Sequence, residues 1–197
     1  MRPTTYALLA MALLMALLPL AVAKPGLPLT LKADEPAYYL AALSLARDHD
    51  LRVDLHDIQR LAEEYPHLST RNLILMTDDG WRTVYYGKPY IYPLLAAPFA
   101  ALFGANGMVS LNLLLLVGMV AMGTAYLRQF NPDWLALLLA AGFVFVSTSW
   151  VYGFWLHPEV FNMAAITASL YLAFRQPPAG PPPRRWWQEL FAVLHPP

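Results

Sequence analysis

Long apolar stretches are the feature that most restricts how this chain folds. The first, YALLAMALLMALLPLAVA, covers residues 6–23 without a charged side chain, and three more follow at 107–126, 134–150 and 160–174. A helix of about 20 apolar residues crosses the ~30 Å hydrocarbon core of a bilayer. Charged residues make up 13% of the chain, whereas soluble domains carry about 25%. We therefore expect an all-α integral membrane protein with about four transmembrane helices.

The first apolar stretch has a second interpretation. An A-x-A pattern at 21–23 is typical of signal-peptidase sites, so residues 1–23 are either the first transmembrane helix or a cleaved leader. Another apolar segment, 94–103, is too short to cross a bilayer. We expect it to form an interfacial or re-entrant helix that turns at 104–107 into the second span.

The charges of the short loops predict the orientation of the spans. The return at 151–157 carries neither Lys nor Arg, whereas arginines flank the expected spans on the other side. Because cytoplasmic loops are rich in Lys and Arg, we expect a multi-pass protein of the cell (inner) membrane with both termini in the cytoplasm. These arginines are Arg2, Arg128, Arg175, Arg184 and Arg185.

Four segments follow from this topology. Residues 1–23 form the first span, 24–92 an outer loop subdomain, 93–174 the interfacial helix with three further spans, and 175–197 a Pro-rich cytoplasmic tail. In that tail, RRWWQELFAVL predicts a cytoplasmic interfacial helix or the start of a fifth span.

The outer loop has its own pattern. Apolar spacing predicts short amphipathic helices at 37–47 and 53–65, the second capped by Asp54 and stopped by Pro66. Two β-prone stretches flank the turn pair Asp79-Gly80 and predict a small β-hairpin with strands at 73–76 and 81–86.

The acidic pair Asp34-Glu35, followed by Pro36, has two interpretations. Asp is a favoured N-cap, Pro is tolerated in the first turn, and acids there suit the helix dipole, so capping alone explains the three residues. The alternative is functional, because ionisable groups near a bilayer often mark sites of chemistry. A carboxylate there could accept a proton from a hydroxyl or amine nucleophile, and a neighbouring one could hold a cation.

The sequence lacks the residues and motifs of several other kinds of site; without cysteine, disulfides, thiolate zinc sites and thiol nucleophiles are excluded. The chain has no cysteine and no GxGxxG, P-loop or HExxH motif. Its 13 basic and 13 acidic residues balance, which gives no indication of nucleic acid as a partner. His49, His56 and His67 lack ligand spacing, and we expect them at the surface.

Three stretches together resemble the multi-spanning C-type-fold glycosyltransferases that include protein O-mannosyltransferases and lipid A aminoarabinose transferases. They are ADEPAYYLAALSLARDHDL after the first span, YYGKPYIYPLLAAPFAALFGANGMVSLNLLLL before and in the second, and WLHPEVFNMAAITASLYLAF at the fourth. The family places an acidic pair at the start of its first outer loop. The resemblance implies transfer of a sugar from a polyprenyl-phosphate donor to an acceptor at the outer leaflet.

The resemblance also implies roles for single residues. Asp34 would be the base and Glu35 a supporting carboxylate that meets the acceptor or a metal; the cofactor is not identified, and a divalent cation is compatible with the pair. Lys88 would hold the lipid phosphate, and His157 and Glu159 would reach the same cavity. For these three, a solvated loop lysine and a helix cap with an interfacial His are the alternatives.

Members of that family carry more spans than these four. The chain is therefore expected to be the N-terminal part of a larger transferase, with a split enzyme or an inactive relative as alternatives. Its partners would be the polyprenyl-linked sugar, membrane lipid and the rest of the transferase. A different class is a non-catalytic membrane subunit that packs through small residues such as Ala121, Gly123 and 140–142. A third class is a secreted protein cleaved after Ala23.

Overall fold

The structure is a computed structural model that describes residues 2–22, 31–66, 68 and 73–175. The predicted tail helix and His67 lie outside these residues. The described chain is mostly helical, as the sequence predicts. Its elements are α1 (Pro3–Val22), α2 (Glu35–Arg47), α3 (Leu55–Glu64), β1 (Leu75–Met76), β2 (Tyr85–Tyr86), α4 (Ile91–Leu127), α5 (Asp133–Phe145), α6 (Ser149–Tyr152) and α7 (Glu159–Phe174).

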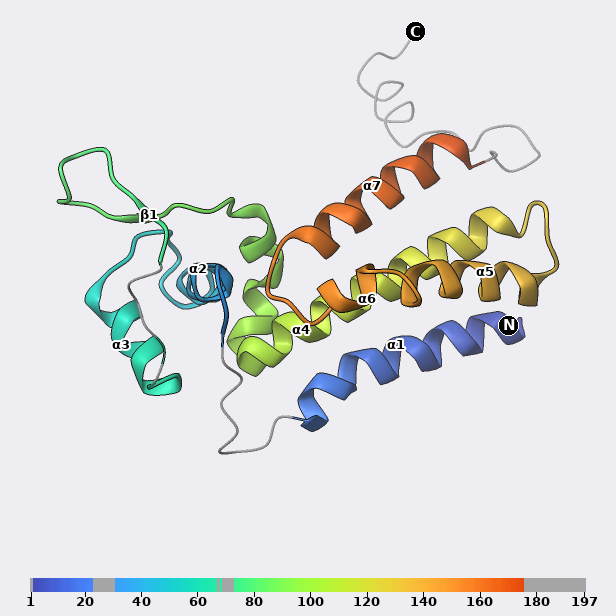
Figure 1. Ribbon diagram of the computed structural model, residues 1–197, viewed down its shortest axis with the longest axis horizontal. Helices are drawn as coiled ribbons and strands as arrows, with labels where there is room; N and C mark the ends of the chain where they lie inside the picture. The colour runs from blue at the N-terminus through green and yellow to red at the C-terminus, as the bar shows by residue number, and fades with distance from the viewer. Residues whose placement is uncertain (1, 23–30, 67, 69–72, 176–197) are drawn as a thin grey trace, which may run out of the picture.

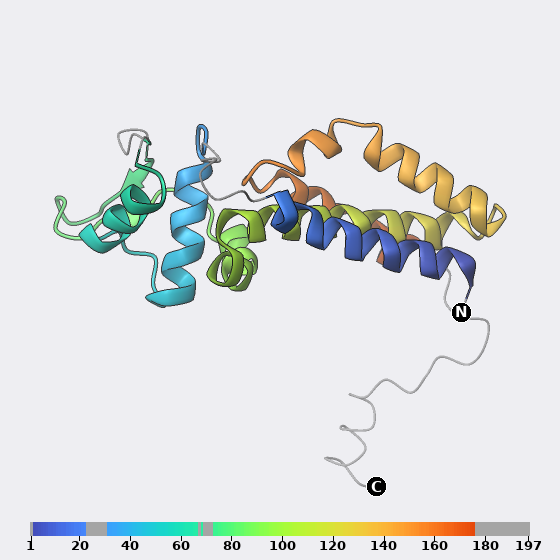
Figure 2. The same cartoon turned by 90° about the horizontal axis from the view of Figure 1, so that it is seen from below.

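Helices α1, α5 and α7 pack against α4 and form a four-helix bundle with it (Figures 1 and 2). The outer subdomain, made of α2, α3 and the two strands, lies at one end of this bundle, and the start of α1 lies at the other. A cluster of small and branched side chains fills the bundle: Leu113, Leu116, Val120, Ala140, Val144, Val160 and Ala164 are all buried.

Two helices, α1 and α4, are long and apolar enough to cross a membrane, whereas α5 and α7 are apolar but shorter. Large apolar side chains point outward from the bundle; Leu13, Phe143 and Ile166 are each more than half exposed. Exposed apolar surface on this scale is costly in water. The two long helices and this surface point to association with a membrane.

Polar bonds hold α1 against α4 near both of its ends. The Ser110 hydroxyl of α4 donates to the carbonyl of Ala16 at 2.9 Å. At the opposite end, Arg128 donates to the hydroxyl of Thr4. Arg2 and Arg128 both pair with Asp133, with N–O distances of 3.2 and 3.3 Å.

The predicted helix at 134–150 is interrupted. Helix α5 ends at Phe145 and the short α6 begins at Ser149. Between them, the Ser147 hydroxyl donates to the carbonyl of Val144 and accepts from the amide of Ser149. Serine hydroxyls compete in this way with the helical backbone bonds, which explains the break.

Helix α4 changes direction at Gly104, where φ is 61° and ψ is −149°. That conformation is essentially restricted to glycine. Close approach also fixes Gly107, because a Cβ there would lie 2.1 Å from the carbonyl oxygen of Phe99. The first limb of α4, up to Phe103, thus meets the second limb at the glycine pair that the sequence predicted as the turn.

The outer subdomain shares a core with α4, which contributes Tyr92 beside Tyr39, Leu40, Leu43 and Leu61. Helix α2 is buried from Glu35 to Ser44, not on one face as an amphipathic pattern would give, because α3 and α4 both pack against it. Helix α3 begins as predicted after Asp54, whose carboxylate accepts from the amide of Asp57. The Asp57 carboxylate accepts in turn from the amide of Asp54, a capping box.

The strands are shorter than the sequence predicts. Leu75 pairs with Tyr86 and Met76 with Tyr85 in an antiparallel ladder of two residues. Gly80 has the positive φ expected of the turn. The Asp79 carboxylate, however, accepts from the amide of Thr83 at 2.8 Å. This local bond takes an amide that a longer ladder would use.

Candidate functional site

Asp34 occupies the N-cap position of α2 but does not cap it. Its φ of −87° and ψ of −6° are helical, whereas a capping Asp is extended. Within the described chain, its carboxylate makes no hydrogen bond to the first-turn amides. Instead, Oδ2 accepts from the Nζ of Lys88 at 2.5 Å, across 54 positions of sequence. The capping interpretation therefore does not account for this side chain.

Asp34 and Lys88 differ in how far they reach solvent. The Asp34 side chain is 35% exposed and that of Lys88 is 17% exposed. The carboxylate is thus accessible to a molecule arriving from outside while it touches a cation that is mostly covered. A partly desolvated ion pair is stronger than one in open water.

Tyr38 lies at the centre of the charged residues and was not predicted from the sequence. It is buried on α2, and the Lys88 Nζ lies 6.0 Å from its ring centroid. Burial raises the pKa of its phenol, an effect that Lys88 opposes and that Asp34 and Glu159 reinforce. The spacing from Asp34 to Tyr38, i to i+4 on a helix, was a signal that could have identified it.

His157 and Glu159 approach Tyr38 from the other side. The ring centroids of His157 and Tyr38 are 5.7 Å apart. The Nδ1 of His157 lies 3.7 Å from the Oε1 of Glu159. Glu159 is the first residue of α7, where an acid suits the helix dipole. Asp34, Lys88, His157 and Glu159, predicted from three separate stretches, therefore gather around one tyrosine.

Glu35 is buried and has both carboxylate oxygens occupied. Oε2 accepts from the amide of Lys32 at 2.7 Å, and Oε1 from the amide of Leu156 at 3.0 Å. These bonds join the start of α2 to the segment before α7. Among the described residues, no three His, Asp or Glu side chains are grouped to hold a metal ion. A metal-binding role for Glu35 thus has no further ligands around it in this part of the chain.

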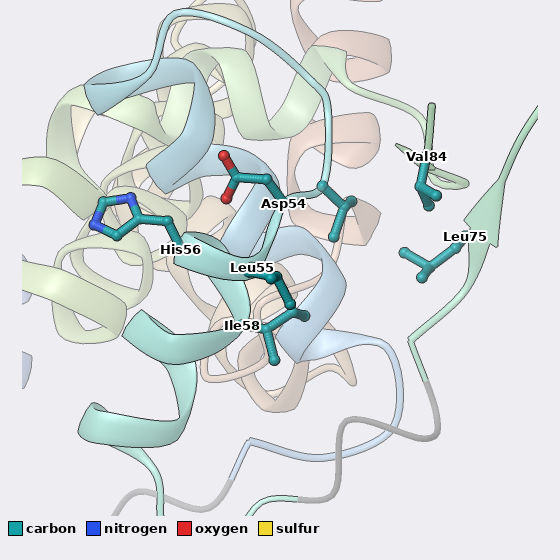
Figure 3. A pocket seen from close by; sticks show the side chains of 7 residues that line it. Asp54, Leu55, His56, Ile58, Leu75 and Val84 are labelled. Atoms are coloured by element: carbon teal, nitrogen blue, oxygen red, sulfur yellow. The ribbon is translucent and has the colours of Figure 1, made fainter. Parts of the chain in front are cut away.

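His49 and His56 are exposed, in agreement with the prediction that they lie at the surface. A hollow of about 600 Å³ opens between the start of α3 and the two strands (Figure 3). Its lining is Val53, Asp54, Leu55, His56, Ile58, Leu75 and Val84, which is mostly apolar and separate from the residues around Tyr38.

Comparisons of the chain with protein-family models, with curated proteins and with solved structures found no match. The arrangement around Tyr38 therefore has to be interpreted from its own chemistry. It contains the partly exposed carboxylate of Asp34, the ammonium group of Lys88 and the ring of Tyr38. The His157–Glu159 pair lies beside that ring.

Proposed function

We propose that the chain crosses the membrane four times, through α1, the second limb of α4, α5 with α6, and α7, with both termini in the cytoplasm. Support comes from the shared end of the bundle where Arg2, Arg128 and Asp133 meet. The end of α7 at Phe174 lies toward the same end (Figure 1). Arginines gathered there fit the cytoplasmic side.

We further propose that the chain is the part of a polyprenyl-phosphate-sugar-dependent glycosyltransferase that carries the first outer loop. The observation that supports this most directly is the contact between Asp34 and Lys88 at the membrane-proximal start of α2. In this contact a carboxylate suited to act as a base lies next to a cation suited to bind a phosphate. The subdomain holding both lies outside the membrane in the topology above.

In the proposed reaction, the Asp34 carboxylate accepts the proton of an acceptor hydroxyl or amine. The freed electron pair forms a bond to the anomeric carbon of the sugar. The bond from that carbon to the polyprenyl phosphate breaks with inversion, and the phosphate leaves with the electron pair. Lys88 neutralises the charge on the leaving phosphate.

The ion pair adds an order to these events. While Lys88 donates to Asp34, the Oδ2 of the carboxylate is occupied by the ammonium group and is not free to accept a proton from the acceptor. A donor phosphate competes for Lys88 and so releases Asp34. Binding of the donor would then prepare the base for the acceptor.

Transfer activity tests this proposal. Membranes that contain the chain together with the rest of the transferase are supplied with polyprenyl-phosphate sugars. Modification of outer-leaflet lipid or glycan is measured for the wild type, for Asp34→Asn and for Asp78→Asn. Loss of a general base lowers the rate by about 10²–10⁴-fold. Asp78 is exposed in the same outer subdomain, so its variant is the matched control. Equal transfer by wild type and Asp34→Asn would overturn the base role.

The exposed side of α7 favours a second candidate, a non-catalytic membrane subunit. Burial along the described α7 is confined to Val160 and Ala164. A groove of about 300 Å³ separates it from α4, lined by Met122, Gly123, Tyr126, Thr167, Leu170, Tyr171 and Phe174. The large apolar side chains of Ile166, Leu170 and Phe174 on α7 are each more than half exposed, which suits packing against another helix. In that case Asp34 and Lys88 only stabilise the fold, and Asp34→Asn leaves any associated activity unchanged.

A further inference from the structure

One peptide group before α7 is held at both of its polar atoms. The carbonyl of Trp155 accepts from the Nδ2 of Asn112 at 2.7 Å. The amide of Leu156, on the other side of the same peptide bond, donates to the Oε1 of Glu35 at 3.0 Å. Asn112 belongs to α4 and Glu35 to α2, so helices from the bundle and from the outer subdomain meet at this peptide.

Both holding side chains are removed from water. Asn112 is fully buried and Glu35 is 9% exposed, while Leu156 is 2% exposed. A buried donor or acceptor that loses its partner costs far more than an exposed one. The two bonds therefore fix this peptide more firmly than solvent-exposed bonds would.

The fixed peptide directly precedes the candidate site. His157 is the next residue, and its ring lies 5.7 Å from the rings of both Tyr38 and Trp155. Glu159, two residues further, begins α7 and contacts His157. A shift of the 155–156 peptide would therefore move His157 and Glu159 away from Tyr38 and Lys88.

We propose that Glu35 and Asn112 are positioning residues, which clamp the 155–156 peptide and thereby set His157 and Glu159 beside the Asp34–Lys88 pair. This gives Glu35 a task in which its carboxylate touches neither acceptor nor metal. The inference rests on the proposed function only in treating His157 and Glu159 as parts of a substrate site; the clamp itself is a property of the fold.

Histidine-selective ¹⁵N NMR of the full chain in detergent micelles tests the clamp. The chain has five histidines, and His157→Asn identifies the signal of His157 by its loss. Glu35→Met keeps the side-chain length but removes both acceptors, and Asn112→Leu removes the donor at similar volume. We expect each variant to shift the His157 signal toward the position of a solvated histidine.

Several controls keep the result interpretable. The signals of the exposed His49 and His56 should stay in place, and an unchanged helical circular dichroism shows that the fold is kept. Thr124→Val removes another buried polar group of α4, whose hydroxyl bonds to the carbonyl of Val120, and should leave His157 unmoved. Glu35→Gln restores an acceptor oxygen and should return the His157 signal at least part of the way.

An unchanged His157 signal in both Glu35→Met and Asn112→Leu overturns the clamp. If one variant loses the helical circular dichroism and is therefore unfolded, the other variant decides. The NMR measurement needs no substrate, so its outcome is independent of the transfer assay. The clamp can be refuted while Asp34→Asn still abolishes transfer, and it can be confirmed while Asp34→Asn leaves transfer unchanged. If both the clamp and the proposed transferase function are correct, Asn112→Leu raises the KM for the donor more than it lowers kcat. The reason is that this variant disturbs donor binding and leaves the base, Asp34, intact.

Discussion

The Nζ of Lys88 donates a hydrogen bond of 2.5 Å to the Oδ2 of Asp34, although the two residues are 54 positions apart in the sequence. The contact joins the start of α2 to the segment that leads into α4, and it diverts a carboxylate from the helix end that its position suggests. Lys88 therefore has two roles: its contact with Asp34 helps to pack the outer subdomain, and it is the proposed phosphate-binding cation.

This contact predicts a measurable coupling. In a double-mutant cycle of Asp34→Ala and Lys88→Ala, we expect a coupling free energy of about 1 kcal/mol, since the pair is only partly exposed. It should shrink at high ionic strength. The measurement is denaturant unfolding in micelles. The Arg2–Asp133 pair, exposed at 67% and 36%, is the comparison and should couple less strongly.

Cysteine accessibility tests the four-span topology. Because the chain contains no cysteine, single replacements report one position each. We expect a membrane-impermeant maleimide to label Asp78→Cys in intact cells, and Gln129→Cys only after the membrane is permeabilised. Both positions are exposed in the structure. Labelling of both in intact cells would contradict the proposed orientation.

The break in α4 predicts opposite effects for two glycines. Gly104→Ala should destabilise the fold by about 1–3 kcal/mol, because alanine is strained at this φ and ψ. Its Cβ would also lie 3.3 Å from the Tyr39 hydroxyl, which donates to Glu64 at 2.7 Å. Gly118→Ala, where a Cβ meets nothing within 4 Å, should gain about 0.5–1 kcal/mol. Unfolding free energies in micelles decide; equal effects would contradict the prediction.

Three buried tyrosines predict alkaline unfolding of the outer subdomain. Burial raises the pKa of the phenols of Tyr39, Tyr65 and Tyr86, with Glu64 reinforcing the first two and Asp57 the third. The unfolded chain releases these protons near pH 10, whereas the folded chain keeps them. Stability is therefore complete below about pH 10 and falls above it, by up to about 1.4 kcal/mol per pH unit for each phenol.

Absorbance at alkaline pH checks this prediction, since tyrosinate formation by these groups should coincide with loss of helical circular dichroism. Tyr39→Phe removes one of the three protons and should make the loss of stability less steep. Ionisation of all three in a chain that keeps its helical signal would contradict it.

Some of the fold could be predicted because its cause is local. Helix α3 begins after Asp54, which caps it, and ends before Pro66, which has no amide hydrogen to donate. Gly104 turns α4 because glycine can adopt the backbone angles of the turn. The break after Phe145 is also local, and the Ser147 and Ser149 hydroxyls were an available signal for it.

The details of the site depend on contacts that no local pattern contains. The pairing of Asp34 with Lys88 requires α2 to pack beside the segment before α4. The role of Glu35 depends on Leu156, 121 positions away, so the acidic pair alone could not separate the tasks of its two members. The family resemblance alone led us to expect His157 in the same cavity as Asp34 and Lys88, and Tyr38 was not expected there at all. The chemical roles of these residues stay predictions.

The bonds at both ends of α1 have a mechanical consequence. Ser110 fixes Ala16 at one height, and Arg128 fixes Thr4 near the opposite end. Sliding α1 along its neighbour by one helical turn, ~5.4 Å, would break both contacts at once. Piston-like movement of α1 is thus opposed at two levels along its length, because it would break both bonds together.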